Sequence, residues 1–229
     1  MKRTIVFTFM LLLLSLAAVK PAMAQEGIKV GFRASPLIGW ASIVDDSTKT
    51  KPTGLTTKAG IGFSFDFVVT YGFSETVAIR SGINIATKSA RSEFDVLGVQ
   101  SSTKTSLTAL EIPLGLKFRS PEIGNGMYII GHFGVNPEIN LQNRTVTDLT
   151  VGGVTTTTEM RDSDDINLFT MSFVPGAGLD WEFDWGMLEF AATYHWGLLS
   201  YTDTRSIAEG GTGLSSRLNY IALNIGYFF

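Results

Sequence analysis

The amino-acid sequence predicts an all-β fold, namely an eight-stranded antiparallel up-and-down transmembrane β-barrel with long extracellular loops and short periplasmic turns. Three observations support this prediction. Apolar and polar residues alternate with a period of two in eight segments, and alternately long and short connections join those segments. After the N-terminal region, the chain is rich in Phe and Gly but contains no apolar run of the ~20 residues that a membrane helix needs. The hydrocarbon core offers no hydrogen-bond partner, so every backbone polar group must be paired within the protein. A spanning structure without helices must therefore be a closed barrel.

Residues 1–24 are predicted to be a cleaved secretory signal peptide. Lys2 and Arg3 give it a positive start, an apolar run follows, and a small-x-small sequence precedes cleavage between Ala24 and Gln25. A transmembrane anchor is the weaker interpretation, because the apolar run is too short to span a bilayer.

The composition of the remaining segment, residues 25–229, fits one barrel domain. The chain has no Cys, so its fold does not depend on disulfides. Removal of Lys2, Arg3 and Lys20 leaves 15 basic residues against 21 acidic ones, a net charge of −6, which does not favour a nucleic-acid partner. We expect no cofactor and no bound metal.

Segment 60–71, GIGFSFDFVVTY, shows the alternation most clearly. Its odd positions are all large and apolar, whereas its even positions are small or polar except for Val68. Such a period of two predicts a β-strand. A soluble β-sandwich, the alternative fold, would need the aromatic face packed inside. In a barrel the aromatic face contacts lipid and Asp66 points into the interior, and this is the arrangement that we expect.

Seven further segments show the same pattern, and each is long enough to cross a bilayer as a tilted strand of ~9–11 residues. The segment 129–136 is the weakest, because Ile130 lies on its polar face. In chain order, the apolar faces carry Val30 and Phe32 in 28–34, Ile79 and Ile83 in 77–85, Leu114 and Leu116 in 109–118, Ile129 and Phe133 in 129–136, Phe173 and Leu179 in 169–182, Phe190 and Tyr194 in 188–198, and Leu223 and Ile225 in 221–229.

The connections predict the orientation of the barrel. Extracellular loops are long and periplasmic turns are short in outer-membrane barrels, which places both mature termini in the periplasm. The long polar connections are 40–58, 89–106, 141–166 and 199–217, and the short ones are 72–75, 119–126 and 184–186. Aromatic girdles are expected at both ends. They are formed by Trp40, Tyr194, Trp196, Tyr201 and Tyr220 at the loop end, and by Tyr71, Phe73, Trp181, Trp185, Tyr227 and Phe229 at the turn end.

Twelve charged side chains are expected to point inward, and six cations balance six anions. An eight-stranded barrel is just wide enough to be filled by side chains, so we expect a closed, salt-bridged interior. We expect a central cluster in which Arg80 lies between Asp66 and Glu111. The inward cations are Lys29, Arg33, Arg80, Lys88, Lys117 and Arg119, and the anions are Asp66, Glu111, Glu138, Asp180, Glu182 and Glu189.

A catalytic alternative rests on the two histidines, His132 and His195, which are both expected to point inward. Ser172 could neighbour His195, but the sequence lacks a nucleophile motif such as G-x-S-x-G. The acidic segment 161–165, RDSDD, lacks the Gly and distal Glu of a calcium loop. We therefore predict no catalytic residues.

The third long connection is expected to contain a hairpin. Two Thr- and Val-rich runs flank Gly152 and Gly153 within 145–160, and Gly-Gly suits a two-residue turn. Strands 129–136 and 169–182 would then continue beyond the membrane as a ribbon with an exposed edge, although a disordered Thr-rich loop is the alternative.

The last residues resemble the C-terminal signal by which insertion machinery recognises outer-membrane barrels, although any last strand could share the pattern. The residues that carry this pattern are Ile221, Leu223, Ile225, Tyr227 and Phe229. With LEIPLGLKF (110–118), GAGLDWEF (176–183) and SGINIATKSA (81–90), the chain is similar to the PorT-like outer-membrane β-barrel family over most of 26–229. This resemblance implies an eight-stranded barrel without catalytic residues, and some members are linked to protein export.

The sequence thus predicts an integral outer-membrane protein that is a non-catalytic structural or surface-interaction barrel. The expected partners are outer-membrane lipid, the insertion machinery at the C-terminal strand and a protein at the extracellular loops. An accessory role in an export apparatus is the alternative, and a lipid-modifying enzyme or a narrow solute channel ranks third.

Overall fold

The computed structural model describes residues 27–45, 47–96, 99–161, 166–202 and 214–229. The expected signal peptide, with its cleavage site between Ala24 and Gln25, lies outside these ranges. Residues 162–165 of the acidic segment also lie outside them. No helix in the described ranges combines the length and the apolar character needed to cross a membrane.

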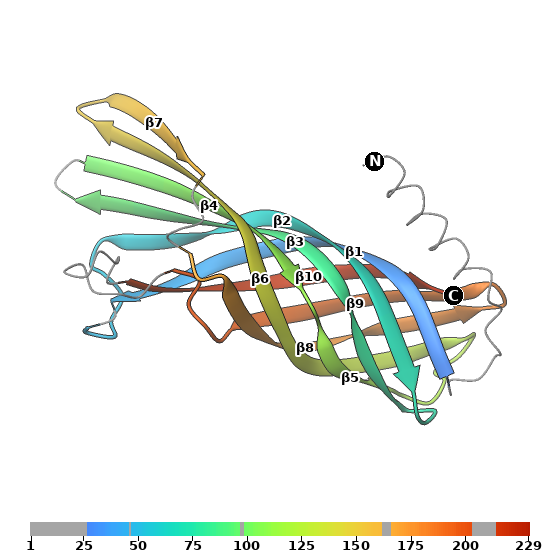
Figure 1. Cartoon of the computed structure of the whole chain (residues 1–229). Helices are drawn as coiled ribbons and strands as arrows, with labels where there is room; N and C mark the ends of the chain where they lie inside the picture. The colour runs from blue at the N-terminus through green and yellow to red at the C-terminus, as the bar shows by residue number, and fades with distance from the viewer. Residues whose placement is uncertain (1–26, 46, 97–98, 162–165, 203–213) are drawn as a thin grey trace, which may run out of the picture.

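The described residues form ten antiparallel strands that close into a ring of eight staves (Figure 1). β1 pairs with β2 on one side and with β10 on the other, and this last pairing closes the ring. The prediction of an eight-stranded up-and-down barrel is confirmed. The strands are β1 (Gly27–Asp45), β2 (Leu55–Gly72), β3 (Val77–Val96), β4 (Val99–Glu111), β5 (Leu114–Arg119), β6 (Met127–Val151), β7 (Val154–Met160), β8 (Phe169–Phe183), β9 (Gly186–Gly197) and β10 (Leu214–Phe228).

The fourth stave consists of two strands, because β4 and β5 both lie between β3 and β6. Pro113 separates them, since proline has no N–H to donate to a ladder. The backbone N–H of Ile112 still donates to the carbonyl oxygen of Pro137 on β6 at 3.0 Å. The single strand expected over 109–118 is therefore interrupted in the middle of the barrel wall.

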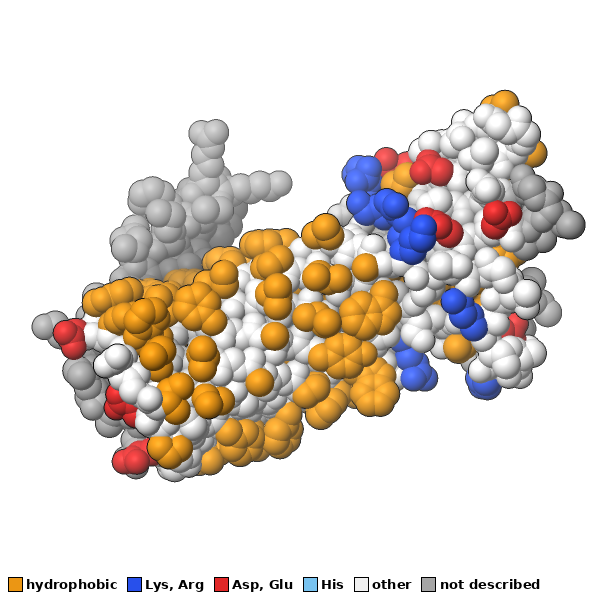
Figure 2. Space-filling model, turned by 180° about the vertical axis from the view of Figure 1, so that it is seen from behind, with side chains coloured by type: hydrophobic (Ala, Val, Ile, Leu, Met, Phe, Trp, Pro, Cys, Tyr) orange, Lys and Arg blue, Asp and Glu red, His pale blue; other side chains and the backbone are white. Residues whose placement is uncertain are grey.

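The two faces of the staves are as predicted. On β2, the side chain of Phe65 is 52% exposed whereas that of its neighbour Asp66 is 1% exposed. Large apolar side chains form a band around the outside of the barrel (Figure 2). Ile130, the exception in the pattern, is buried at 1% exposure and fills part of the interior.

Five of the aromatic residues at the turn end of the barrel, where the short connections lie, form a continuous chain of ring contacts. Trp181 packs on Phe183, Phe183 stacks on Trp185, and Trp185 stacks on Tyr227. Tyr227 meets Phe229 edge-on at 4.9 Å, so this chain of rings joins β8 to β10. Such a belt suits a membrane interface.

At the opposite end, the loop end, two of the expected girdle residues are not on the surface. Trp40 stacks on Tyr194 at 5.9 Å and Trp196 is exposed, as expected. Tyr220, however, is 2% exposed inside the barrel, and Tyr201 is 7% exposed beneath the loops. Their assignment to the girdle is wrong, because Tyr220 has the inward parity on β10 and Tyr201 packs against a described part of the loops.

Much of the sequence expected to form loops is strand instead. β3 and β4 pair from Asn84–Glu111 as far as Val96–Val99, so most of 89–106 is a hairpin. β1 and β2 likewise extend into 40–58. Beyond the apolar band neither face of these strands meets hydrocarbon, so the alternation that reveals a strand within the membrane is lost. Figure 1 shows the extended strands flaring away from the barrel.

The hairpin expected in 145–160 is present. β6 pairs with β7 from Thr145–Met160 to Val151–Val154. Gly152 and Gly153 form the turn with φ of 57° and 83°, and two positive φ angles characterise a type I′ turn. The structure differs from the expected continuous ribbon in one respect. β7 and β8 both pair with β6, but they are separate strands. The pairing of β6 with β8 stops at Ile139–Phe169.

Apolar layers lie near both ends of the interior. At the loop end, Leu107, Ile166 and Tyr201 form a buried cluster, and Ile166 bridges to Thr202. The described parts of the third and fourth long connections therefore cover the mouth. Near the turn end, Val68, Met187 and Phe228 form the second layer.

Candidate functional site

The polar interior is the first candidate site. Ten of the twelve charged side chains expected inside are buried there: Arg33, Asp66, Arg80, Lys88, Glu111, Lys117, Arg119, Glu138, Asp180 and Glu189. Lys29 and Glu182 are half-buried at the turn end, with side-chain exposures of 23% and 32%. All twelve take part in ion pairs, so the expectation of a salt-bridged interior is confirmed.

Glu189 on β9 is the centre of the larger of two ion-pair clusters. Its carboxylate accepts hydrogen bonds from Arg80 Nη1 and Lys117 Nζ, both at 2.9 Å. Arg33 Nη1 lies 3.8 Å from the same carboxylate, while Arg33 Nε donates to Asp66 at 2.9 Å. Three cations from β1, β3 and β5 therefore meet one carboxylate from the far side of the barrel.

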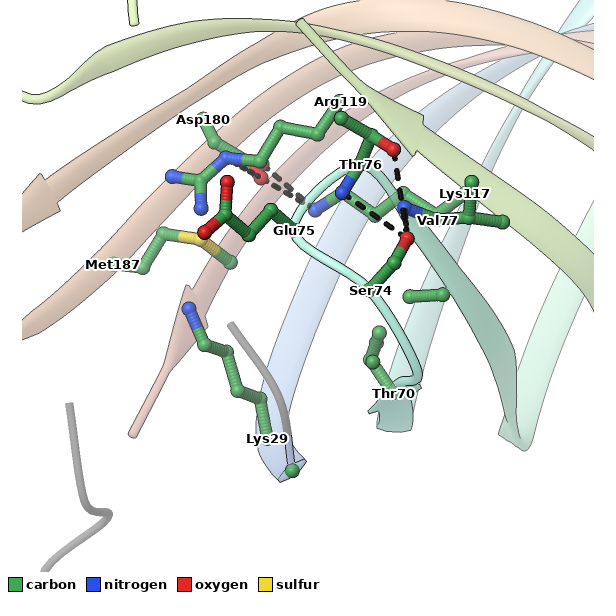
Figure 3. Close-up of a pocket in the computed structure, with 13 residues that line it drawn as sticks. Lys29, Thr70, Ser74, Glu75, Thr76, Val77, Lys117, Arg119, Asp180 and Met187 are labelled. Atoms are coloured by element: carbon green, nitrogen blue, oxygen red, sulfur yellow. Dashed lines mark hydrogen bonds and ion pairs between the residues drawn. The ribbon is translucent and has the colours of Figure 1, made fainter. Parts of the chain in front are cut away.

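The larger cluster continues to the turn end, where Figure 3 shows Lys117 directed at Asp180 with Arg119 beside it. Lys117 Nζ lies 2.7 Å from Asp180 Oδ2, and Arg119 Nη1 lies 3.1 Å from Glu182 Oε1. Lys29 Nζ contacts the same Glu182 oxygen at 2.6 Å. Arg119 Nε lies 3.7 Å from Asp180 Oδ2 and joins the two groups of contacts. The cluster thus contains five cations and four anions and carries a formal charge of +1.

The smaller cluster lies nearer the loop end and contains one cation and two anions. Lys88 Nζ lies 2.6 Å from Glu111 Oε1 and 2.6 Å from Glu138 Oε2. This cluster has a formal charge of −1, so the balance of six against six holds for the interior as a whole and not for each cluster. Hydrogen bonds spread the negative charge, and they are donated to Glu111 by Asn84, Asn136 and Tyr220, and to Glu138 by Thr170 and Ser172.

The predicted position of Arg80 between Asp66 and Glu111 is wrong, although all three side chains are buried. The register places Asn84, not Arg80, level with Asp66 on β2 and with Glu111 on β4. Arg80 lies four residues before Asn84 on β3, roughly 13 Å towards the turn end at about 3.4 Å per residue. The arrangement of one cation between two carboxylates is formed instead by Lys88 with Glu111 and Glu138.

Aromatic rings separate and support the charged layers. Tyr220 lies under the Lys88 ammonium group at 5.0 Å and stacks on His195 with ring centroids 4.0 Å apart. Phe228 lies under Arg80 and Lys117 at 5.5 and 5.6 Å. Charged and aromatic side chains thus fill the cross-section, as the diameter of an eight-stranded barrel predicts.

The histidines do not form a catalytic arrangement with Ser172 in this structure. Ser172 Oγ donates to Glu138 at 2.9 Å, whereas His195 Nε2 hydrogen-bonds Thr193 Oγ1 at 3.2 Å. His132 lines a cavity of about 50 Å³ beside Arg80 and Asn84, where several buried polar atoms lack a protein partner. A cavity of this size suits water where such unpartnered polar atoms face it. No group of three or more potential metal ligands gathers within the described ranges.

The second candidate site is the ribbon at the loop end. β7 pairs with β6 on one side, and no strand of the described chain pairs with its other edge. All seven residues of β7 are exposed. Thr157 Oγ1 donates to Asp148 on β6 at 2.7 Å, and Arg144 holds Glu159 through two hydrogen bonds of 2.9 and 3.0 Å. The hairpin is therefore ordered by its own side chains while its outer edge is free.

A closed ring of eight amphipathic staves, apolar outside and ion-paired inside, defines a small membrane-spanning β-barrel. The model of the outer membrane protein β-barrel domain family matches residues 20–203. The chain belongs to this family. No curated protein matches the chain.

A solved structure of a bacterial outer-membrane protein has a similar fold. The outer membrane protein OprG from Pseudomonas aeruginosa is 14% identical with a TM-score of 0.51, over 89% of this chain and 96% of that one. This likeness concerns the fold alone. Neisserial surface protein A matches at 11% identity and a TM-score of 0.43, over 89% and 98% of the two chains. Ail of Yersinia pestis matches at 13% identity and a TM-score of 0.33, over 89% and 99%.

Proposed function

We propose that this protein is an integral outer-membrane barrel without catalytic activity, which binds a partner protein by adding a strand of that partner to the free edge of β7. The observation that carries this proposal is the single-sided pairing of β7, a fully exposed strand held in a fixed hairpin. An unpaired strand edge is a template for another chain.

The hairpin geometry identifies the backbone groups that would bind. Val151 and Val154 flank a two-residue turn and therefore exchange hydrogen bonds. Because hydrogen-bonded and non-hydrogen-bonded pairs alternate in an antiparallel ladder, Thr155, Thr157 and Glu159 direct their N–H and C=O groups away from β6. These three residues form the docking edge of the proposal.

The interior supports a role as a rigid scaffold. A barrel whose charges are paired in layers offers a fixed base for the loop-end ribbon. In this proposal the loop end is extracellular, both mature termini are periplasmic, and the insertion machinery binds the C-terminal strand. Those assignments agree with the long connections at one end of the ring and the short ones at the other.

A photo-crosslinking residue at position 155 in intact cells tests the docking edge. We expect a discrete crosslinked product that disappears in the Thr157→Pro variant, because proline removes the outward N–H without removing a bond to β6. Thr157→Ala is the matched control, since it removes the side-chain bond to Asp148 but keeps the N–H, and it should retain the product. A product that is unchanged by Thr157→Pro, or the absence of any product, would contradict strand addition.

An accessory role in protein export is the second candidate. It is favoured by the similarity of 110–118 and 176–183 to the PorT-like family, segments that lie in the staves β4, β5 and β8. Deletion of the gene should then change the set of exported proteins, and a mutant carrying Thr157→Pro should show the same change. An unaltered set of exported proteins after deletion would exclude the export role while leaving the docking edge open to the crosslinking test.

A further inference from the structure

The outer face of the flared sheet contains a hollow of about 260 Å³ just beyond the apolar band. It is lined by three cations, Arg91 on β3, Lys104 on β4 and Arg144 on β6. Ser102, Ser106 and the Asp148 carboxylate complete the polar lining. Figure 2 shows Lys and Arg side chains gathered where the flared sheet leaves the barrel.

The register makes this cluster unfavourable for the protein alone. Lys58, Arg91 and Lys104 lie directly opposite one another across β2, β3 and β4. Like charges opposite one another in a ladder destabilise a sheet. Lys58 is neutralised by Glu93 at 2.6 Å, but no ion pair within the described ranges involves Arg91 or Lys104. The adjacent pair of uncompensated cations favours binding of an anion.

The height of the hollow indicates the origin of that anion. On β6 the exposed Leu141 lies three residues before Arg144, and on β2 the exposed Ile61 lies three residues after Lys58. Three residues span roughly 10 Å of a strand, and strand tilt reduces the corresponding height to about 8 Å. The polar headgroup layer begins directly outside the ~30 Å hydrocarbon core. The hollow therefore lies at headgroup level and faces the lipid side of the wall.

We infer that Arg91 and Lys104 bind the phosphate group of a membrane lipid in this hollow. A guanidinium group matches phosphate oxygens in a bidentate fashion, and the ammonium group adds a second charge-assisted contact. The serine hydroxyls can donate to the remaining oxygens. Asp148 lines the hollow, and Glu159 already neutralises Arg144, so the site is limited to one compact anion rather than a long polyanion.

Native mass spectrometry of the folded protein with dioctanoyl phosphatidic acid tests this inference, with dioctanoyl phosphatidylcholine as the neutral lipid. We expect the double variant Arg91→Gln with Lys104→Gln to bind phosphatidic acid about tenfold more weakly, because two charge-assisted contacts are lost. The matched control, Lys49→Gln with Lys51→Gln in the β1–β2 connection, loses the same charge and should bind as the wild type does. Heat-modifiable gel mobility confirms that each variant is folded.

Two results would overturn the inference. One is equal binding of phosphatidic acid by the wild type and the Arg91–Lys104 double variant. The other is preferential binding of a soluble sulfated oligosaccharide, or of inorganic phosphate, over phosphatidic acid, with the same dependence on Arg91 and Lys104. Preference for the sulfated oligosaccharide or for inorganic phosphate would show that the hollow binds a soluble anion instead of a lipid.

Discussion

Glu111 and Glu138 stand directly opposite each other across the β4–β6 strand pair inside the barrel. Two carboxylates at such a position repel each other, and Lys88 Nζ lies 2.6 Å from an oxygen of each. Lys88 is 1% exposed, so water cannot replace it. The wall of the barrel therefore depends at this level on a single ammonium group.

Replacement of Lys88 by Met should reduce the free energy of unfolding by about 3–5 kcal/mol, the usual cost of removing one partner from a buried ion pair. The measurement is urea unfolding of the reconstituted barrel together with heat-modifiable gel mobility. Lys51→Met, on the exposed β1–β2 connection, serves as the control and should leave the unfolding midpoint unchanged. An unaltered midpoint for Lys88→Met would show that Glu111 and Glu138 do not depend on Lys88.

Replacement of Arg80 by Met should reduce stability less than replacement of Lys88. Glu189 would keep Lys117 at 2.9 Å and Arg33 at 3.8 Å, so its charge would remain compensated. The same unfolding experiment compares the two variants. A larger loss for Arg80→Met would mean that Arg80 holds the larger cluster together by itself.

The barrel should show negligible steady conductance in planar bilayers. Its interior is filled by two ion-pair clusters and by the rings of Tyr220 and Phe228, and Leu107, Ile166 and Tyr201 cover the loop end. Single-channel recording of the purified protein is the measurement. Large, stable steps of porin size would contradict the prediction and support the solute-channel alternative.

Hydrogen exchange should distinguish the two edges of the hairpin. Amides of β6 from 145 to 151 should exchange slowly throughout, because this strand is bonded to β4 on one side and to β7 on the other. On β7 we expect alternation, with slow exchange at Val154, Thr156 and Thr158 and fast exchange at Thr155 and Thr157. Uniformly fast exchange across 145–159 would indicate a disordered loop, and uniformly slow exchange on β7 would mean that its outer edge is already paired.

The hairpin should resist moderate acid. A hydrogen bond from Arg144, with a second from Arg161, lowers the pKa of Glu159 to about 2. Because the folded-state pKa is depressed, the stabilisation is fully present above the unfolded value of about 4.3 and is lost as the pH falls towards 2. Carboxyl-carbon NMR should show Glu159 still ionised near pH 3.5, and Arg144→Gln should raise its pKa. An unshifted titration in the wild type would show that the Arg144–Glu159 pair does not form in solution.

Periodicity predicts which face each residue occupies, but it contains no information about height. The alternation in 60–71 places Asp66 inside and Phe65 outside, as the structure has them. It could not identify Glu189 as the partner of Arg80, because that contact crosses the barrel between two residues 109 positions apart in sequence. Neighbouring strands are also staggered relative to one another in a tilted barrel. This stagger places Asn84, and not Arg80, level with Asp66.

The loop end was predicted least well for a related reason. Alternation arises only where one face of a strand meets lipid and the other meets the interior, and 89–106 lies beyond that region. The hairpin at 145–160 could be predicted because two features of its chemistry act locally, namely β-branched residues and a Gly-Gly turn. The hollow beside Arg91 and Lys104 requires three strands in register, and no single stretch of sequence reveals it.

The pairing of β1 with β10 also determines the order in which the molecule can mature. Gly31 pairs with Phe228, so the first stave remains open on one side until β10 has reached the membrane. A chain that lacks β10 would present two bare strand edges, and in hydrocarbon each unpaired backbone group costs several kcal/mol. A barrel that lacks this strand is therefore unstable in the membrane. Closure of the barrel therefore waits for β10, because this strand supplies the missing partner of both β1 and β9.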